Sequence, residues 1–465
     1  MDLKKNQTYE VTIDSASAEG FGVCRIDGRA VFVPGTIPGE KWVIRLLKVT
    51  ETVIWAKGVE CQLRSLMRIE NDCPNPCGGC VLRHVQYEEE LRQKKNRVDE
   101  CLRRIGRQTV LTDCIHPSPQ IERYRNKAIF AVGLSEGRAA FGFYRTRSHD
   151  LIPISDCLLQ SENCLHTARA VIDFMNSNGI LPYDETTRKG IVRHLFYRES
   201  EKAGVLCIVA ARGFGEKTSY LVQYLRDHCQ WLTGIVLNIN KSTGNTVLKG
   251  DFYTLWGKPQ IRDILCGVEF VISPQAFFQI NPKQAEAIYR KAIEYSGNPK
   301  KVLDLYCGAG TISLCFAKSG ISVIGVDIVP EAIENARKNA EENHLTNVSF
   351  ICADTADRKL HAELDSHPVD TIVVDPPRKG LSQPIVLEIA QLAPEKIIYV
   401  SCNPATLARD IENLSNYGYS LRKAEAFDMF PRCGHVETVC CLYHQKKDFI
   451  SVPYEPKDDD YLKNR

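Results

Sequence analysis

The clearest pattern of apolar positions in the chain predicts a strand, a glycine turn, a helix and a second strand. Residues 302–305 form an apolar run that is too short for a helix, and a turn with Gly308 and Gly310 follows it. Residues 311–318 predict the helix, and residues 322–326 predict a buried strand with an aspartate at its carboxyl end. This order is half of a doubly wound α/β sheet, in which ligands bind outside the carboxyl ends of the strands.

Two further apolar runs, 369–374 and 396–400, predict more strands of the same sheet. Asp375 follows the first run, and Cys402 follows the second. Because the carboxyl ends of parallel strands share one edge of a sheet, we expect both side chains in the crevice beside the glycine turn. Residues 272–446 therefore predict a Rossmann-like α/β domain.

The two regions before this domain have different patterns, and together they predict a multi-domain protein. Residues 1–58 contain short alternating segments separated by glycines, which predict a five-stranded β-barrel of the oligonucleotide-binding type. Residues 59–271 predict a central α+β domain. Within it, residues 87–105 predict a charged amphipathic helix whose basic face we interpret as solvated. Residues 122–147 interleave basic and aromatic side chains, which favours a sheet that faces RNA.

Composition narrows the class of protein. The chain has 465 residues, of which 44% are hydrophobic and 25% are charged, as in ordinary globular proteins. No apolar stretch reaches the length of a membrane span and no signal peptide opens the chain, so we expect a cytoplasmic monomer without a membrane partner. Because the net charge is only +2, RNA binding has to come from local patches. Residues 447–465 form a charged tail.

Three of the nineteen cysteines lie within eight residues, in a turn rich in proline and glycine: Cys73, Cys77 and Cys80. Disulfides are rare in the cytoplasm, so these thiols predict a metal site. A zinc ion and a four-iron cluster would each need a fourth ligand, and the spacing alone does not decide between them. His84 is close in sequence to this turn.

The glycine turn also indicates a type of cofactor. Asp327 follows the glycines by about twenty residues, the usual spacing for an acid that binds ribose hydroxyls. No third glycine follows Gly310 at the spacing of the dinucleotide fingerprint. This pattern argues against NAD and favours a nucleoside cofactor without a pyrophosphate, such as S-adenosylmethionine.

A cysteine in the same crevice suits methyl transfer to a ring carbon. Carbon 5 of a pyrimidine is a poor nucleophile, but thiolate addition at carbon 6 turns carbon 5 into an enolate that can accept a methyl group. Cys402 is the candidate for this attack. A base then has to remove the proton from carbon 5, and Glu437 is the best candidate nearby.

Several motifs resemble known families. The stretch AEGFGVCRIDGRAVFVPGTIPGE resembles the TRAM domain, an RNA-binding barrel. DLYCGAGTISL, DPPRKG, SCNPATLARD and HVETV resemble the RNA uracil carbon-5 methyltransferases, which make 5-methyluridine. Together with the cysteine turn, the TRAM stretch narrows the resemblance to 23S ribosomal RNA uracil methyltransferases that carry a [4Fe-4S] cluster.

The resemblance implies roles for individual residues. It implies Cys402 as the nucleophile and Glu437 as the base. It implies cofactor contacts at Gln279, Tyr306, Asp327 and Asp375. It implies cluster ligands at Cys73, Cys77, Cys80 and Cys157. The family often has five residues between the first two of these cysteines, whereas this chain has three, and the family wraps a helix near residues 87–105 onto its catalytic domain.

Three alternatives stay open: a tRNA 5-methyluridine methyltransferase, an enzyme that methylates a pyrimidine nitrogen or cytosine carbon 5, and a non-catalytic RNA-binding protein. Methylation of a nitrogen needs no thiol, and cytosine chemistry needs a proton donor to the ring nitrogen, for which the motifs show no dedicated acid. The non-catalytic alternative is disfavoured because four residues suited to chemistry are intact: Asp327, Asp375, Cys402 and Glu437.

Overall fold

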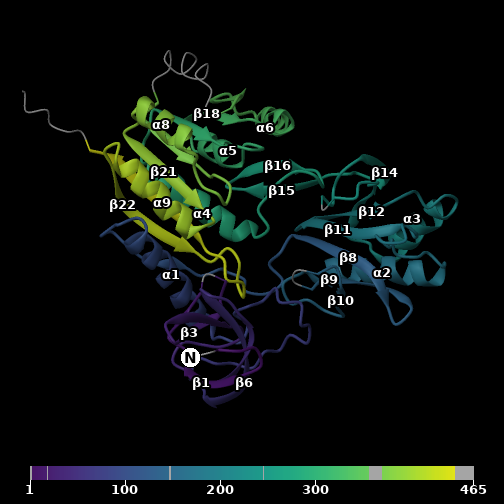
Figure 1. Ribbon diagram of the computed structural model, residues 1–465. Helices are drawn as coiled ribbons and strands as arrows, with labels where there is room; N and C mark the ends of the chain where they lie inside the picture. The colour runs from purple at the N-terminus through teal and green to yellow at the C-terminus, as the bar shows by residue number, and fades with distance from the viewer. Residues whose placement is uncertain (1–2, 18, 146–147, 245, 355–368, 446–465) are drawn as a thin grey trace, which may run out of the picture.

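The computed structural model describes residues 3–17, 19–145, 148–244, 246–354 and 369–445, and it contains three sheet-based units (Figure 1). In Figure 1 the N-terminal barrel lies at the bottom, the central domain at the right and the C-terminal α/β domain at the upper left. The tail predicted at 447–465 lies outside the described residues. None of the helices described is long and apolar enough to cross a lipid bilayer.

The N-terminal unit is a six-stranded sheet in the order β1-β5-β6-β4-β3-β2. Its strands are β1 (Thr8–Thr12), β2 (Ser15–Ala16), β3 (Gly22–Ile26), β4 (Arg29–Val33), β5 (Lys41–Val49) and β6 (Val53–Leu63). Alternate residues point inward, as Val31 and Val33 do on β4, and they form one apolar core. The prediction of five strands was wrong by one, because the two-residue β2 extends the edge at β3.

The central unit is a seven-stranded sheet in the order β10-β9-β8-β11-β12-β13-β14. Its strands are β8 (Lys127–Ser135), β9 (Arg138–Tyr144), β10 (Leu151–Pro153), β11 (Val192–Ser200), β12 (Ala203–Ala210), β13 (Leu232–Ile239) and β14 (Asp251–Gly257). Its helices, which share the apolar core of the sheet, are α2 (Glu162–Ser177) and α3 (Lys217–His228).

The aromatic side chains of the predicted RNA-facing segment are mostly packed inside the protein. Phe130 and Phe141 belong to the core that also contains α2, and Tyr124 is buried in a small cluster of its own. Arg123 forms an ion pair with Asp156, with 2.9 Å between nitrogen and oxygen. The alternating aromatic positions are therefore largely the inward positions of the sheet, and the RNA-facing surface of this sheet stays a prediction.

The C-terminal unit is an eight-stranded sheet in the order β19-β18-β17-β20-β21-β23-β22-β7. Its strands are β7 (Ile115–His116), β17 (Lys301–Leu305), β18 (Ser322–Asp327), β19 (Val348–Cys352), β20 (Thr371–Val374), β21 (Lys396–Ser401), β22 (Tyr419–Phe427) and β23 (Glu437–His444). The five strands from β19 to β21 are parallel, and β23 runs antiparallel to β21. The doubly wound arrangement predicted from the sequence is present.

Helices cover both faces of this sheet. One apolar core contains α4 (Pro282–Ser296), α5 (Thr311–Lys318), α6 (Pro330–Glu342) and the hairpin β15 (Ile261–Leu265) to β16 (Val268–Ile272). The core on the other face contains α1 (Tyr87–Arg104), α8 (Gln383–Leu392) and α9 (Pro404–Ser415). Successive side chains of each strand point alternately into the two cores. Both faces of these strands are therefore buried, which explains their continuous apolar runs.

Helix α1 belongs to the C-terminal unit by its packing, although it precedes the central unit in the sequence. Val98 and Leu102 are fully buried in the same core as Leu407 and Ile411 of α9. Figure 1 shows α1 between the barrel and the C-terminal sheet. A segment that precedes the central unit in the sequence is therefore part of the C-terminal unit. The domain boundaries at residues 58, 271 and 446 stay predictions.

Candidate active site

The turn after β17 lies directly beside the carboxyl end of β18. The backbone N–H of Gly308 donates to Oδ2 of Asp327 at 2.9 Å, and the N–H of Val329 donates to Oδ1 at 2.9 Å. Gly310 has φ 78°, and a Cβ there would lie 2.9 Å from Phe350. Glycine is thus required at Gly310 both for the backbone angle and for close packing.

The space above this turn is open to a ligand. Gly308 also has a positive φ, 54°, and a Cβ added to it would meet no atom within 4 Å. Tyr306 precedes it in the same left-handed region, with φ 67°, which is unusual for an aromatic residue. The turn therefore offers backbone groups and the Asp327 carboxylate to a nucleoside, as the sequence pattern predicts.

Asp375 and Gln279 border the same edge of the sheet. Gln279 hydrogen-bonds to the buried hydroxyl of Tyr289, and the Asp375 carboxylate lies close enough to that tyrosine to raise its pKa further above the value that burial produces. Burial raises the pKa of Asp375 itself to about 7. Asp304 on β17, fully buried behind the turn, has a pKa raised to about 7 by burial, although Ser313 donates to its carboxylate at 2.5 Å.

Cys402 and Glu437 lie next to this carboxylate. Burial, followed by the negative charges of Glu437 and Asp375, raises the pKa of Cys402 to about 11. Burial and Asp375 raise the pKa of Glu437 well above its ordinary value, and the guanidinium of Arg378 opposes both shifts. One thiol, two carboxyl groups and one cation therefore share a small volume at the carboxyl edge of the sheet.

The loops after β20 and β21 are joined to each other. The side chain of Asn403 donates to the carbonyl of Arg378 at 3.0 Å, and Thr406 donates to the same carbonyl at 3.2 Å. Asn403 also caps α9, because its Oδ1 accepts from the N–H of Ala405 at 3.2 Å. These bonds hold Cys402 on a turn at the edge of the sheet, where its half-buried thiol is reachable.

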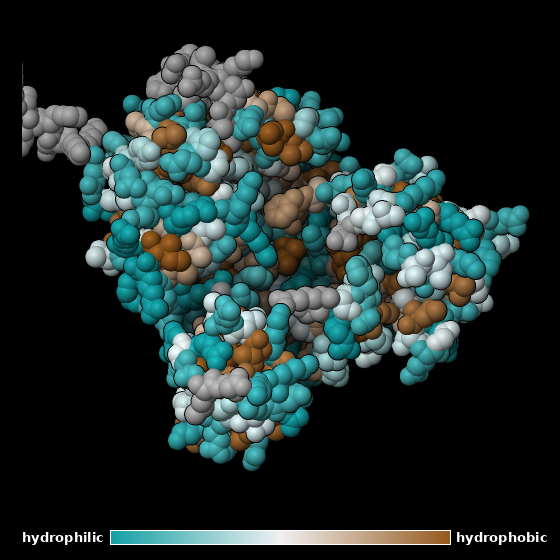
Figure 2. All heavy atoms as spheres, in the orientation of Figure 1, coloured by the Kyte–Doolittle hydropathy of each residue, from teal (hydrophilic) through white to brown (hydrophobic). Residues whose placement is uncertain are grey.

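A cleft of about 740 Å³ opens in front of Cys402. Three parts of the molecule line it: the barrel near Ser15 and Pro38, helix α1, and the loops that carry Cys402 and His435. Figure 2 shows a hollow where the three units meet, whereas none of the residues that line the cleft belongs to the central sheet. The basic residues of α1 that line the cleft are Arg92, Lys94, Arg97 and Arg104. The prediction that this basic face is solvated holds for Arg92 and Arg104, whose side chains are more than half exposed, and is wrong for Lys94, which is buried.

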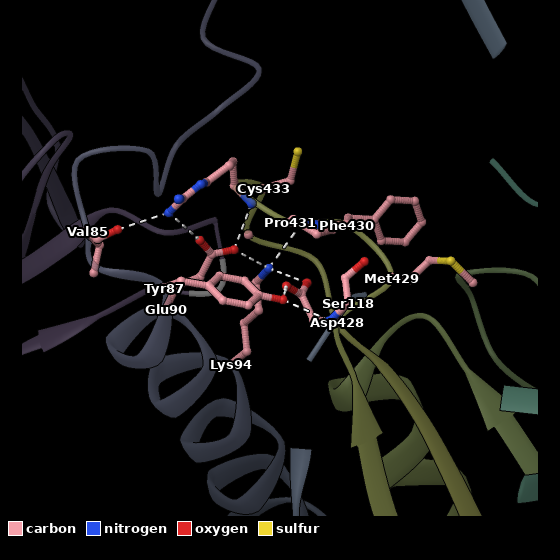
Figure 3. Close-up of polar contacts among 12 residues, drawn as sticks. Val85, Tyr87, Glu90, Lys94, Ser118, Asp428, Met429, Phe430, Pro431 and Cys433 are labelled. Atoms are coloured by element: carbon pink, nitrogen blue, oxygen red, sulfur yellow. Dashed lines mark hydrogen bonds and ion pairs between the residues drawn. The ribbon is translucent and has the colours of Figure 1, made fainter. Parts of the chain in front are cut away.

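A buried network of charges fixes the loop that leads to Glu437 (Figure 3). The Lys94 ammonium lies 2.7 Å from Glu90 and 2.6 Å from Asp428, and it donates to the carbonyl of Phe430 at 3.1 Å. All three charged groups are at most 2% exposed. Glu90 also accepts from the N–H of Arg432 at 2.7 Å. Helix α1 thereby holds residues 428–432 although more than 300 residues separate the partners.

Five cysteines form a second group, between the barrel and the central unit. Burial, followed by the Cys433 and Cys157 thiols, raises the pKa of Cys80 to about 12, while Cys77 contributes to the raised pKa of Cys157. Cys80, Cys157 and Cys433 pack in one cluster with Tyr124. The sulfur of Cys73 instead has its polar contacts with its neighbour Asn75, whose amide nitrogen is 3.8 Å away.

The group holds only cysteine thiols, a donor type that both structural zinc ions and iron–sulfur clusters take. Tetrahedral zinc at about 2.3 Å would draw its thiolates to about 3.8 Å from one another. Among the described residues, no three of these sulfurs lie within 4.8 Å of one another. A cluster binds each thiolate to a different iron and so accepts a wider spacing. The donor chemistry of Cys77, Cys80 and Cys157 therefore fits the cluster that the resemblance implies, whereas the Cys73 sulfur is directed to Asn75.

Sequence reasoning missed three contributors to the sites. Arg378 directly follows the DPP motif, but nothing in the sequence around it predicted that its positive charge lies near Cys402. Arg97 donates to the carbonyl of Gly434 at 2.6 Å, a contact that depends on where α1 packs. Cys433 is one cysteine among nineteen, and no local spacing pairs it with the turn at residues 73–80.

The fold and this edge of the sheet define a class of nucleoside-dependent methyltransferases, and comparison with known proteins gives the family. The TRAM domain matches residues 2–57, and the family described as tRNA (Uracil-5-)-methyltransferase matches residues 86–446. The chain belongs to this family and is an RNA (uracil-5-)-methyltransferase. The predictions of the family and of the TRAM domain are confirmed.

Similar proteins include bacterial relatives and an archaeal structure. An uncharacterized RNA methyltransferase of Listeria innocua is 38% identical over 95% of this chain and 98% of its own length. One of Clostridium acetobutylicum is 37% identical over the same shares. The crystal structure of Pyrococcus abyssi tRNA (uracil-54, C5)-methyltransferase in complex with S-adenosyl-L-homocysteine has a TM-score of 0.77 and 28% identity, and the match covers 93% of this chain and all of that one. Its bound ligand agrees with the cofactor predicted here.

Proposed function

We propose that this enzyme methylates carbon 5 of uracil through a covalent bond between Cys402 and the base. The observation that carries the proposal is the grouping of Cys402, Glu437, Asp375 and Arg378 at the carboxyl edge of the sheet, at the end of an open cleft. Methylation of a pyrimidine ring carbon needs a nucleophilic thiol, whereas methylation of a nitrogen does not. This grouping therefore favours methylation of carbon.

The first step in the proposed mechanism is attack by Cys402. Its thiol is protonated at rest because burial and two carboxylates raise its pKa, so the proton must leave before attack. Asp375 is the neighbouring carboxylate that can accept this proton, which leaves Glu437 free for the later step. The thiolate adds to carbon 6 of uracil, and the electron pair of the 5,6 double bond moves to carbon 5 and the carbonyl oxygen. S-adenosylmethionine supplies an electrophilic methyl group to carbon 5.

Glu437 completes the reaction by removing the proton from carbon 5. The electron pair of that C–H bond restores the double bond and expels Cys402 as a thiolate. A carboxylate whose pKa is raised by burial is a stronger proton acceptor than an ordinary one, which suits a carbon acid. Arg378 opposes the raised pKa of both Cys402 and Glu437, so it helps each group to carry its negative charge when the mechanism requires it.

Four residues are proposed to hold the cofactor: Gln279, Tyr306, Asp327 and Asp375. Asp327 accepts two backbone N–H groups, which fix its carboxylate and leave lone pairs for ribose hydroxyls. The open space beside Gly308 gives room for the amino-acid part. Gln279 is itself held by the central unit, because the side chain of Asn126 donates to its carbonyl at 3.0 Å.

The proposed target is 23S ribosomal RNA. The support is the combination of a TRAM barrel with the cysteine turn, on which the resemblance to the ribosomal enzymes rests. A tRNA target is the second candidate, because the Pyrococcus abyssi structure is that of a tRNA methyltransferase. The monomeric state and the cytoplasmic location also stay predictions.

We further propose a [4Fe-4S] cluster in the cysteine group. Cys77, Cys80 and Cys157 supply three thiolates, and the resemblance implies Cys73 as the fourth. The role of the cluster would be to hold structure or position RNA, since the methyl transfer needs no electron transfer. Protein purified without air should be brown and contain four irons per chain; zinc without visible absorption would contradict this.

Labelled S-adenosylmethionine tests the activity and the target together. The enzyme would be incubated with ribosomal RNA and, separately, with tRNA from a strain that lacks the modification, and the labelled nucleosides would be identified. We expect 5-methyluridine from ribosomal RNA. Label in tRNA alone would contradict the ribosomal target, and 5-methylcytidine or no transfer would contradict the proposed activity.

A further inference from the structure

A fifth thiol, that of Cys433, lies within the cysteine group although it comes from the C-terminal unit. Its S–H donates to the carbonyl of Gly79 at 3.3 Å, across 354 residues of sequence. It is buried, and it packs with Cys80 and Cys157 around Tyr124. Gly79 precedes Cys80 in the turn, so this bond places the Cys433 sulfur beside the turn that carries Cys77 and Cys80.

The surroundings of Cys433 suit a thiolate bound to metal. Arg125 donates to its sulfur at 3.3 Å, from Nη2. Four thiolates give an iron–sulfur group negative charge, and a hydrogen-bond donor at a ligand sulfur is one means by which proteins stabilise it. Arg125 directs its guanidinium to Cys433, and the structure shows no comparable donor from a basic residue at Cys73 among the residues described.

The loop that carries Cys433 is held in place by contacts with the cysteine turn and with α1. The N–H of Leu82, two residues after Cys80, donates to the carbonyl of Arg432 at 3.1 Å. The buried charges of Glu90 and Lys94 fix the residues just before it (Figure 3). These contacts fix the position of the Cys433 sulfur beside the cysteine turn.

The sulfur of Cys73 is directed differently. Its polar contacts in the described part of the chain are with Asn75, and the Asn75 amide is in turn anchored to the carbonyl of Asp156 at 2.6 Å. The loop between Cys73 and Cys77 contains two prolines and only three residues, which restricts how far Cys73 can turn toward the other thiols.

We propose that Cys433 is the fourth thiolate ligand of the iron–sulfur cluster, with Cys77, Cys80 and Cys157, in place of Cys73. This inference rests on the proposed cluster. Because Cys433 is four residues before Glu437 on one loop, the cluster then joins the cysteine turn, the central unit and the catalytic base. Loss of the cluster would free the loop at the point where it enters the active site.

The test measures iron, sulfide and the electron paramagnetic resonance spectrum of the full chain, purified without air and reconstituted with ferrous iron and sulfide. The variants are Cys433→Ser, Cys73→Ser and Cys77→Ser, with Cys352→Ser, an exposed cysteine on β19, as the control. We expect about four irons in the wild type, Cys73→Ser and Cys352→Ser, and loss of at least half of the iron in Cys433→Ser and Cys77→Ser.

Two further measurements keep the test decisive. Binding of S-adenosylhomocysteine shows that each variant is folded, because the cofactor turn is distant from the thiols in the sequence. If serine retains iron, the spectrum of the reduced Cys433→Ser cluster should still differ from that of the wild type, since an oxygen ligand changes the iron that it binds.

The possible results separate the inference from the proposed cluster. The role of Cys433 would be overturned if Cys433→Ser kept four irons and an unchanged spectrum while Cys73→Ser lost iron. The proposed cluster itself would then still stand. Iron lost in both variants would overturn the exclusion of Cys73. A wild-type protein that holds zinc or no metal after reconstitution would overturn the cluster and the inference together.

Discussion

The cofactor turn and the loop that carries Glu437 meet at one site, but they are held by different interactions. The turn is local: Gly308 and Asp327 bond within one strand–helix–strand unit, and Gly310 packs against Phe350. The loop depends on buried charges of α1, a helix more than 300 residues earlier in the sequence. A substitution in the turn can therefore weaken cofactor binding without moving Glu437, and a substitution in α1 can displace the Glu437 loop without disturbing the cofactor turn.

The largest expected effect comes from removing the central charge of the loop. Lys94→Met leaves Glu90 and Asp428 buried without their cation, which should lower the free energy of unfolding by about 3–5 kcal/mol. Chemical denaturation measures this. The matched control is Lys95→Met on the same helix, whose ion pair with Asp99 is partly exposed and should cost about 1 kcal/mol or less. Equal effects of the two variants would show that the loop is not held by the buried network.

The cofactor turn should respond to added methyl groups in two different ways. Gly310→Ala combines an unfavourable φ with overlap against Phe350, so we expect a loss of about 2–4 kcal/mol in unfolding free energy. Gly308→Ala meets no protein atom and should cost only about 1–2 kcal/mol, yet it places a methyl group toward the cofactor space. Calorimetry should therefore show weak S-adenosylhomocysteine binding by Gly308→Ala in a folded protein. Unchanged binding would contradict the position proposed for the cofactor.

Cofactor affinity should depend on pH through Asp375. Its carboxyl group has a pKa of about 7, so it is mainly neutral at pH 6 and mainly ionised at pH 8. S-adenosylmethionine carries a positive sulfonium, and its affinity should rise up to about tenfold over this interval. Asp375→Asn should remove the dependence. If the slope persists in that variant, the neighbouring Asp304, whose pKa is also about 7, is its source.

The smallest effect is expected at the rim of the cleft. Arg104→Gln on α1 removes one candidate phosphate contact, which should weaken RNA binding a few-fold and lower the slope of log affinity against log salt by about 1. Arg107→Gln is the control, because Arg107 is exposed nearby but does not line the cleft. Equal losses in both variants would mean that the cleft is not the path of the RNA.

The sequence predicts the local parts of this molecule well. The glycine turn, Asp327, and the strands before Asp375 and Cys402 follow from apolar runs and turn residues that are adjacent in the chain, and the doubly wound sheet follows from them. Contacts between distant segments were not predictable in this way. The basic face of α1 and the thiol of Cys433 carry no signal in their own neighbourhoods, because their partners are set by how the units pack.

The burial of the aromatic residues in 122–147 was not predictable for a related physical reason. Alternation of basic and aromatic residues in 122–147 marks the two faces of a strand but does not say which face is covered. Helix α2 covers the aromatic face, so Phe130 and Phe141 became core.

The central claim is that Cys402 attacks the base and that Glu437 removes the proton afterwards. A denaturing gel with labelled RNA and S-adenosylmethionine tests it most directly, for the wild type, Cys402→Ala and Glu437→Gln. Glu437→Gln should accumulate a protein–RNA adduct that survives denaturant and contains an already methylated base, since only the last step is blocked. Cys402→Ala should bind RNA yet form neither adduct nor product. An adduct with Cys402→Ala, or full turnover by Glu437→Gln, would contradict the mechanism.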